Sequence, residues 1–309
     1  MQAENIPVID IRQLDHPNTL AAIDSACREW GFFQIVNHGI PQSITENIVR
    51  EMRAFFAQPI NVKRQVSRTQ DNLWGFYDRE LTKNVVDLKQ IYDFGPGNGR
   101  DIEPQWPREM PEFRNAVHNY YSHNQRLAHR ILAAISTNLG MSPGFLSRGF
   151  GPDHTSFLRL NYYPVTQASH GNGHLGVGQH TDSGALTILL QDDQPGLEVF
   201  RNNNWHLIEP RRDALVVNIG DIVQVWSNDN YFAALHRVIA SADKPRFSIP
   251  FFLSPGYRTN YAPVPTMVSE DHPARYKEIN WGEFRRLRAD GDYADVGEEV
   301  QIEQFRIHA

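Results

Sequence analysis

The sequence predicts an all-β core with flanking helices, and three observations support this fold class. From Ser156 onward, short apolar segments recur with turn residues between them, as at Gln194-Pro195-Gly196. Before residue 150 the apolar residues recur instead with helical spacing. The 309-residue chain is 40% hydrophobic and 21% charged, which is ordinary usage for a globular protein with a sizeable core. Many short strands separated by turns favour a closed sheet or a sandwich.

The first 150 residues are expected to form a helical support for this core. The expected elements, in order, are a strand at 7–11, a helix with apolar residues Leu20, Ile23, Cys27 and Trp30 that ends at Gly31, a strand at 32–36, a helix that begins with the capping box Ser43-Ile44-Thr45-Glu46, an edge strand at 87–94, and a long helix at 111–139 stopped by Gly140.

The core strands are expected in the second half of the chain. They are predicted at 156–164, 176–182, 185–191, 197–200, 204–208, 214–219, 222–226, 233–241 and 246–253, with a helix at roughly 280–290 after them. No internal repeat, linker or low-complexity run interrupts the chain. We therefore expect one domain over 1–309, made of an N-terminal support at 1–150, a β core at 151–255 and a C-terminal lid region at 256–309.

Charge and cysteine content limit the classes of partner and compartment. The formal net charge is −6, which argues against a nucleic-acid partner, since such a partner favours a basic surface. Cys27 is the only cysteine, so an intramolecular disulfide is impossible and a reducing, cytoplasmic compartment fits. We see neither a signal peptide nor an apolar run of about 18 residues, and we expect no membrane partner.

A candidate metal site lies in the stretch Gly178-Gln179-His180-Thr181-Asp182. Residues two apart on a strand point to the same face, so His180 and Asp182 are predicted to project together. His236 is the candidate third ligand. A His-x-Asp pair alone is more often structural, but two histidines and one carboxylate form the facial triad that holds non-haem Fe(II) and leaves coordination positions open.

A candidate carboxylate-binding pair follows His236 on an apolar segment. Arg246 and Ser248 share a strand face in Arg246-Phe247-Ser248-Ile249-Pro250. A guanidinium presents a rigid fork that suits a carboxylate, and a buried arginine is costly unless it meets an anion. The sequence therefore predicts a metal site and a carboxylate clamp on neighbouring strands.

Taken together, these motifs resemble the iron and 2-oxoglutarate-dependent oxygenases, within the isopenicillin N synthase-like family. The resemblance extends over nearly the whole chain. It includes Ile6-Pro7-Val8-Ile9-Asp10, the segment from Gly31 to Ile40, and Asn161-Tyr162-Tyr163-Pro164. It implies a double-stranded β-helix, or jelly roll, for the core.

The resemblance also implies cofactors and roles for single residues. Fe(II) would bind His180, Asp182 and His236, with 2-oxoglutarate and O2 as co-substrates. Arg246 and Ser248 would bind the distal carboxylate of 2-oxoglutarate, Tyr163 would add a phenol to that clamp, and Asn161 would lie near the metal. The reaction implied is oxidative decarboxylation to succinate and CO2, coupled to oxidation of a small organic molecule.

The sequence says least about which residues bind the primary substrate. Phe252 continues the inward face of 246, 248 and 250, and the resemblance adds the segment around Ile91 and Asp93 to the mouth of the site. An aromatic-rich mouth suits a small organic substrate, as in natural product metabolism. His170 and His174 stand four residues apart, but the glycines between them predict a loop and not a metal-binding helix.

Two alternatives remain open from the sequence. The first is an iron oxidase, cyclase or ethylene-forming enzyme that does not use 2-oxoglutarate, because Arg246-x-Ser248 supports carboxylate binding more firmly than it supports one co-substrate. The second is a non-catalytic ligand sensor on the same fold, which the intact triad disfavours. Consumption of O2 with turnover would separate the sensor from the enzymes.

Overall fold

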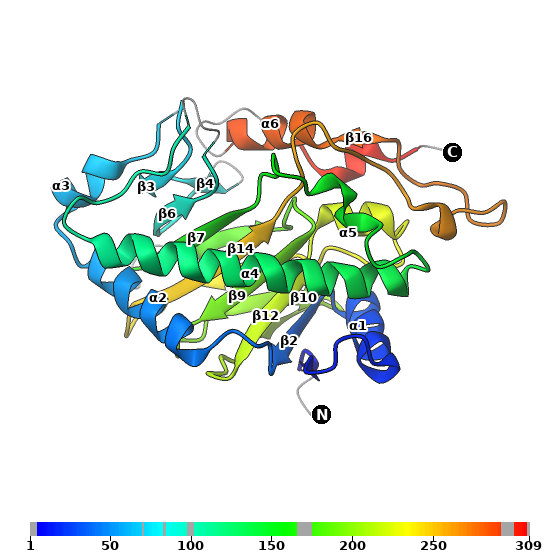
Figure 1. The fold of residues 1–309 in the computed structure, drawn as a ribbon, viewed down its shortest axis with the longest axis horizontal. Helices are drawn as coiled ribbons and strands as arrows, with labels where there is room; N and C mark the ends of the chain where they lie inside the picture. The colour runs from blue at the N-terminus through cyan, green and yellow to red at the C-terminus, as the bar shows by residue number, and fades with distance from the viewer. Residues whose placement is uncertain are drawn as a thin grey trace.

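Two β-sheets form the centre of the molecule in the computed structural model, which describes residues 5–69, 71–82, 85–97, 102–165, 175–291 and 300–307 (Figure 1). The larger sheet has the order β1-β2-β12-β9-β14-β7-β6-β3, and the smaller has the order β11-β10-β13-β8. Side chains of both sheets pack together between them. This is the expected jelly-roll architecture, in which two sheets share one interior.

The strands of the two sheets occupy most of the predicted segments. Their bounds are β1 Val8–Asp10, β2 Phe32–Val36, β3 Gly75–Tyr77, β6 Gln90–Phe94, β7 Phe157–Tyr163, β8 Leu175–His180, β9 Leu186–Gln191, β10 Leu197–Arg201, β11 Asn204–Leu207, β12 Ala214–Ile219, β13 His236–Ile239 and β14 Arg246–Leu253. Two short pairs lie outside them, β4 Leu81–Thr82 with β5 Val85–Val86, and β15 Asn260–Tyr261 with β16 Ile279–Asn280.

Helices flank the two sheets (Figure 1). They are α1 Pro17–Glu29, α2 Gln42–Phe56, α3 Ile60–Lys63, α4 Pro111–Asn138, α5 Asp221–Trp226 and α6 Trp281–Gly291, with short 3₁₀ turns at Arg64–Val66, Leu146–Gly149, Pro265–Met267 and Ile302–Phe305. The long helix α4 runs across β7, β9 and β14, and α1 and α2 pack on it (Figure 1). Gly140 ends α4 as predicted, with φ +74° and its amide bonded to the Thr137 carbonyl.

Strand β9 shows how the sequence divides its side chains between two environments. Leu186, Ile188 and Leu190 belong to the apolar core that includes the helices. Leu189 belongs to the cluster between the two sheets, and Thr187 also faces that interior. This two-residue alternation is the property of strands that places polar side chains on one inward face.

Four local predictions were wrong. Residues 222–226 belong to helix α5, because a short continuous apolar run reads alike for a buried strand and a buried helix. Helix α2 begins at Gln42 with no side-chain cap, so Ser43 lies inside it and the capping box is absent. Strand β6 is interior, since it pairs with both β3 and β7. Asp182 lies beyond the end of β8, in a turn and not on a strand.

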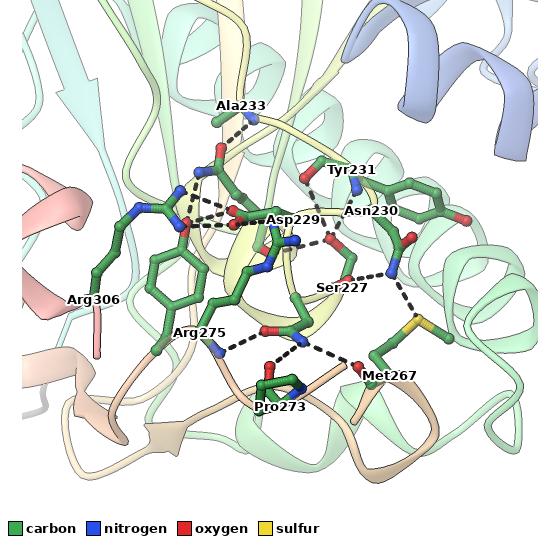
Figure 2. A network of polar contacts seen from close by, with 12 residues as sticks. Ser227, Asp229, Asn230, Tyr231, Ala233, Met267, Pro273, Arg275 and Arg306 are labelled. Atoms are coloured by element: carbon green, nitrogen blue, oxygen red, sulfur yellow. Dashed lines mark hydrogen bonds and ion pairs between the residues drawn. The ribbon is translucent and has the colours of Figure 1, made fainter. Parts of the chain in front are cut away.

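The loop after α5 holds the C-terminal segment through a polar network, which Figure 2 shows. Asp229 accepts hydrogen bonds from both terminal nitrogens of Arg306, at 2.7 and 3.1 Å, and from Arg275 and Tyr276. The side-chain amide of Asn228 donates to the carbonyls of Met267 and Pro273. These contacts fix the chain on either side of α6 against the core.

Candidate active site

His180, Asp182 and His236 meet at one end of the smaller sheet. His180 ends β8, His236 begins β13, and the two residues are direct partners in the antiparallel register. Their ring centres lie 4.3 Å apart. Asp182 Oδ1 lies 3.8 Å from His180 Nε2 and 3.7 Å from His236 Nε2. One donor atom from each residue lies within 4.8 Å of the others, which is a spacing that one metal ion can bridge.

Hydrogen bonds to the remaining atoms orient this donor set. Nδ1 of His180 contacts the Gly178 carbonyl at 2.8 Å, and Nδ1 of His236 contacts the Ala234 carbonyl at 3.1 Å. When Nδ1 of each ring carries the proton, Nε2 keeps a lone pair that can bind a metal ion between the three side chains. Asp182 Oδ2 accepts hydrogen bonds from Thr187 and Asn218, so Oδ1 remains for a metal. The arrangement fits a divalent cation.

Electrostatics keep His180 and Asp182 in the protonation states that a metal requires. Burial and the neighbouring His236 lower the pKa of His180, which therefore stays neutral at pH 7. Burial alone would raise the pKa of Asp182, but the two imidazoles and the hydrogen bonds from Thr187 and Asn218 lower it below its ordinary value. His180 thus offers a neutral imidazole and Asp182 a carboxylate, which are the forms that bind a metal.

Arg246 lies in the interior with unused hydrogen-bond donors. Its side chain is 1% exposed, and its Nη2 donates to Gln191 at 2.9 Å. Nε and Nη1 are buried without a partner among the described residues. Burial lowers the pKa of this guanidinium, as expected for a cation with no carboxylate in hydrogen-bonding contact. Buried polar groups are rarely left unpaired, so these donors indicate a place for an anion.

The other predicted clamp residues stand beside Arg246 on strand β7. Tyr163 is the register partner of Arg246, and Asn161 is the partner of Ser248. The Arg246 guanidinium carbon lies 5.3 Å from the centre of the Tyr163 ring. The Asn161 amide approaches Ser248 Oγ at 3.4 Å, and its carbonyl oxygen has no partner within the described structure.

These residues and the metal donors line one cavity between the sheets, called here the inner cavity. It contains the whole predicted inward face of β14, namely Arg246, Ser248, Pro250 and Phe252. It also contains the donor set and the β7 face, namely His180, Asp182, His236, Asn161 and Tyr163. The structure therefore brings the predicted metal and clamp residues together around one space.

A second, outer cavity adjoins the first and extends to α6. His180, Asp182 and Phe252 line both cavities. Phe252 stacks on Phe157, with ring centres 4.6 Å apart. Ile91 and Asp93, the other predicted substrate residues, line neither cavity. Ile91 is fully buried as the register partner of Asn161, and Asp93 is the partner of Arg159.

Six charged side chains near the outer cavity form a buried charge cluster that the sequence did not reveal. Asp93 holds Arg159 through two bonds of 2.7 and 2.8 Å and Arg68 through one of 3.0 Å. Glu80 contacts all three cations of the cluster, and Lys89 also contacts Asp87 at 2.9 Å. Within the cluster the three cations, Arg68, Lys89 and Arg159, face the three carboxylates, Glu80, Asp87 and Asp93.

Charge pairing outweighs burial and keeps Glu80 and Lys89 ionised. Burial alone would raise the pKa of Glu80, but Arg159, Lys89 and Arg68 lower it well below its ordinary value. Burial alone would lower the pKa of Lys89, but Glu80 and Asp87 raise it. Lys89 and Arg159 line both cavities, so the cluster brings fixed positive groups to the site.

The sequence contained a weak signal for the hydrogen-bond donors to Asp182. Thr187 lies in the apolar run Ala185–Leu190, and Asn218 lies in the apolar run Ala214–Ile219. A single polar residue on a fully buried strand needs a partner, which marks it as a structural or functional residue. The other predicted candidates, His170 and His174, lie outside the described residues.

Comparisons with known proteins identify the family. A model described as the 2OG-Fe(II) oxygenase superfamily matches residues 154–255, and one described as non-haem dioxygenase in morphine synthesis N-terminal matches 6–113. Jasmonate-induced oxygenase 2 of Arabidopsis thaliana is 34% identical over 295 residues, which are 92% of this chain and 79% of that protein. Flavonol synthase 1 of Crocosmia x crocosmiiflora is 33% identical, over 91% and 85% of the two chains.

Solved structures agree with this result. The structure described as JOX2 in complex with 2OG, Fe and JA is 33% identical with a TM-score of 0.81, and the match covers 92% of this chain and 85% of that one. The structure described as the dioxygenase for auxin oxidation in rice is 26% identical with a TM-score of 0.78, over 98% and 100% of the two chains. These relatives are named oxygenases, and one of the structures contains 2OG and Fe. The comparisons therefore favour neither of the two alternatives left open by the sequence, the ligand sensor and the enzyme that does not use 2-oxoglutarate. The chain belongs to the 2OG-Fe(II) oxygenase superfamily and is an oxidoreductase that uses Fe(II) and 2-oxoglutarate to oxidise a small molecule.

Proposed function

We propose that His180, Asp182 and His236 bind the Fe(II) of this oxygenase and that Arg246 binds the distal carboxylate of 2-oxoglutarate. The observation that carries the proposal is the inner cavity, which holds the donor set together with the two unpaired donors of Arg246. Fe(II) supplies the redox chemistry and the activation of O2 when it is bound. The protein residues bind, orient and exclude water around it.

Five further residues that line the inner cavity have roles in this proposal. Ser248 adds a hydroxyl donor beside Arg246, and Tyr163 adds a phenol on the neighbouring strand. The amide of Asn161 faces Ser248 and orients the co-substrate between clamp and metal. Thr187 and Asn218 hold Asp182 so that one carboxylate oxygen is presented to the metal.

We further propose that the primary substrate occupies the outer cavity. Phe252 contacts it, because this ring lines both cavities beside the metal donors. Asp93 acts indirectly by holding Arg159 at the cavity wall, and Ile91 supports Asn161 from the adjacent strand. Their part in substrate binding is therefore to position the residues that line the site.

We also propose a metabolic role, a location and a domain organisation for this enzyme. The relatives named for flavonoid substrates favour a role in natural product metabolism. The single buried cysteine fits a cytoplasmic location, and the negative net charge fits a protein without a nucleic-acid partner. Among the described residues, no helix has the length and apolar character needed to cross a membrane. We propose that residues 1–309 act as one oxygenase domain, since N-terminal strands join the larger sheet.

Replacement of the central ligand tests the metal assignment. Asp182→Ala should bind Fe(II) far more weakly than wild type and should release no succinate, because the only carboxylate of the donor set is lost. Anaerobic titration with Fe(II) measures the affinity, and far-ultraviolet circular dichroism checks the fold. Asp193→Ala, which removes an exposed carboxylate, is the matched control. Wild-type iron affinity in Asp182→Ala would place the metal elsewhere.

A further inference from the structure

Arg285 brings an unpaired positive charge to the outer cavity. It lies on α6 and lines this cavity together with Arg288. Arg285 forms no hydrogen bond or ion pair with any residue that the structure describes, although it is only partly exposed. A guanidinium has five N–H donors, and this one lines a cavity without an acceptor in the described part of the chain, so it is available to a ligand.

Arg288 shows that the face of α6 that carries Arg285 lies near the metal donors. Residues three apart on a helix are neighbours on one face, so Arg285 and Arg288 extend from the same side of α6. Arg288 donates to the carbonyl of Thr181, the residue between His180 and Asp182, at 3.3 Å. Arg285 therefore lies one helical turn from Arg288, which contacts the segment between His180 and Asp182.

Lys89 offers a second donor from the charge cluster. Its ammonium group has three N–H donors, of which Glu80 and Asp87 receive two at 2.7 and 2.9 Å. No described residue receives the third, and Lys89 lines both cavities although it is 7% exposed. A buried ammonium with an unused donor at a cavity wall attracts an acceptor oxygen.

The charges around the outer cavity favour an anion. The carboxylates of the charge cluster already pair with the cations of the same cluster, and Asp182 belongs to the metal donor set. Arg285 therefore adds a positive charge that no described carboxylate balances. A neutral substrate would leave this guanidinium without a counter-charge inside a partly enclosed site.

We infer that the primary substrate is a small carboxylic acid whose carboxylate binds Arg285 at the mouth, with Lys89 as a second donor on the cavity wall. This inference rests on the proposed function, because it takes the outer cavity as the substrate site. The acid end is held at α6, and the carbon skeleton extends past Phe252 toward the metal donors. Steering by the positive mouth also selects acids over neutral compounds of the same shape.

Matched pairs of an acid and its neutral derivative test the inference. The probes are jasmonate with its methyl ester and indole-3-acetate with its amide, titrated anaerobically into the protein loaded with Fe(II) and 2-oxoglutarate. At least one acid should bind tenfold or more tightly than its neutral partner. Arg285→Leu should weaken binding of that acid about 10- to 100-fold, the range for a lost hydrogen bond to a charged group, and leave the neutral partner unchanged.

Two control variants separate charge from packing. Arg285→Lys should restore part of the affinity, because a point charge replaces the bidentate fork. Arg286→Leu removes an exposed neighbour on α6 that lines neither cavity, and it should bind the acids as wild type does. Equal binding of acid and neutral partners, no binding of either acid at millimolar concentration, or wild-type affinity in Arg285→Leu would overturn the inference.

A separate assay distinguishes failure of this inference from failure of the proposed function. Succinate release from 2-oxoglutarate without any primary substrate depends on the inner cavity alone. It should persist in Arg286→Leu and be lost in Asp182→Ala. Persistence in Asp182→Ala would contradict the proposed function, whereas loss of succinate release in Asp182→Ala together with wild-type acid affinity in Arg285→Leu would contradict only the assignment of Arg285 to the substrate.

Discussion

Phe252 stands where the inner and outer cavities meet, so in the proposed function one ring separates the co-substrate side from the substrate side. It is partly exposed, while the next residue, Leu253, is fully buried on the opposite face of β14. The ring is supported on one side by Phe157, which leaves its other contacts for ligands. In the proposed function, this position lets an apolar side chain contribute to specificity in a site with many charges.

Truncation of this ring should weaken primary substrate binding. Phe252→Ala should raise the KM for the primary substrate by removing apolar contact, with a loss of about 1–3 kcal/mol in kcat/KM. The KM for 2-oxoglutarate should stay near the wild-type value. Steady-state kinetics on both substrates make the comparison, with Tyr257→Ala, an exposed aromatic, as the control. A change confined to the 2-oxoglutarate KM would show that Phe252 faces the other ligand.

At the scale of residues, the sequence predicted donors that are close in sequence or follow a strand period. His180, Asp182, Arg246 and Ser248 belong to this class. Thr187 and Asn218 were not predicted, because β9 and β12 reach Asp182 only after the sheets have formed. The charge cluster was hidden for the same reason, since Glu80 and Arg159 are far apart in the chain.

Helix α5 carries an acidic group at its first turn in an unusual environment. Asp221 is fully buried, and neither carboxyl oxygen has a hydrogen-bond partner of standard geometry among the described residues. Burial raises the pKa of Asp221 to about 7 from an ordinary value of 3.8. The folded protein therefore keeps this carboxyl group protonated at mildly acidic pH, while the unfolded chain has already released the proton.

This difference predicts a loss of stability as the pH rises. Between about pH 4 and pH 7 the unfolded state binds fewer protons than the folded state, so the contribution of Asp221 to the free energy of unfolding falls with rising pH. Asp221→Asn should remove the loss and gain up to roughly 4 kcal/mol over wild type at pH 8, from about 1.36 kcal/mol per pKa unit. Urea unfolding of both metal-free proteins across this range measures it. Parallel curves for the two proteins would contradict the assignment.

At the scale of elements, long helices and strands with clear patterns were predicted well. Strands 32–36, 214–219 and 246–253 agree with β2, β12 and β14 to the residue. The error at α5 has a physical cause, because this helix is only six residues long and fully buried, and so short an apolar run does not reveal a helical period. The network of Asp229 and Arg306 was also unpredictable, since it joins segments far apart in the chain.

The whole molecule places two adjoining cavities between its sheets and its C-terminal helix. Strands from both halves of the chain build the larger sheet, and the C-terminal segment is tied to the loop after α5 (Figures 1 and 2). The sequence predicted the fold class from short strands separated by turns. It did not predict that β3 and β6 extend the larger sheet beside β7. Pairing between distant segments depends on packing that no local pattern records.

The arrangement leads to one central claim, that the inner cavity is shaped for 2-oxoglutarate by Arg246. Its most direct measurement is succinate release against 2-oxoglutarate concentration in wild type, Arg246→Leu and Arg246→Lys, with Arg237→Leu, an arginine that lines neither cavity, as the control. Arg246→Leu should bind iron normally and lose about 2–5 kcal/mol in co-substrate affinity, and Arg246→Lys should recover part of it. Substrate oxidation by wild type without a 2-oxo acid, or a wild-type 2-oxoglutarate KM in Arg246→Leu, would contradict the claim.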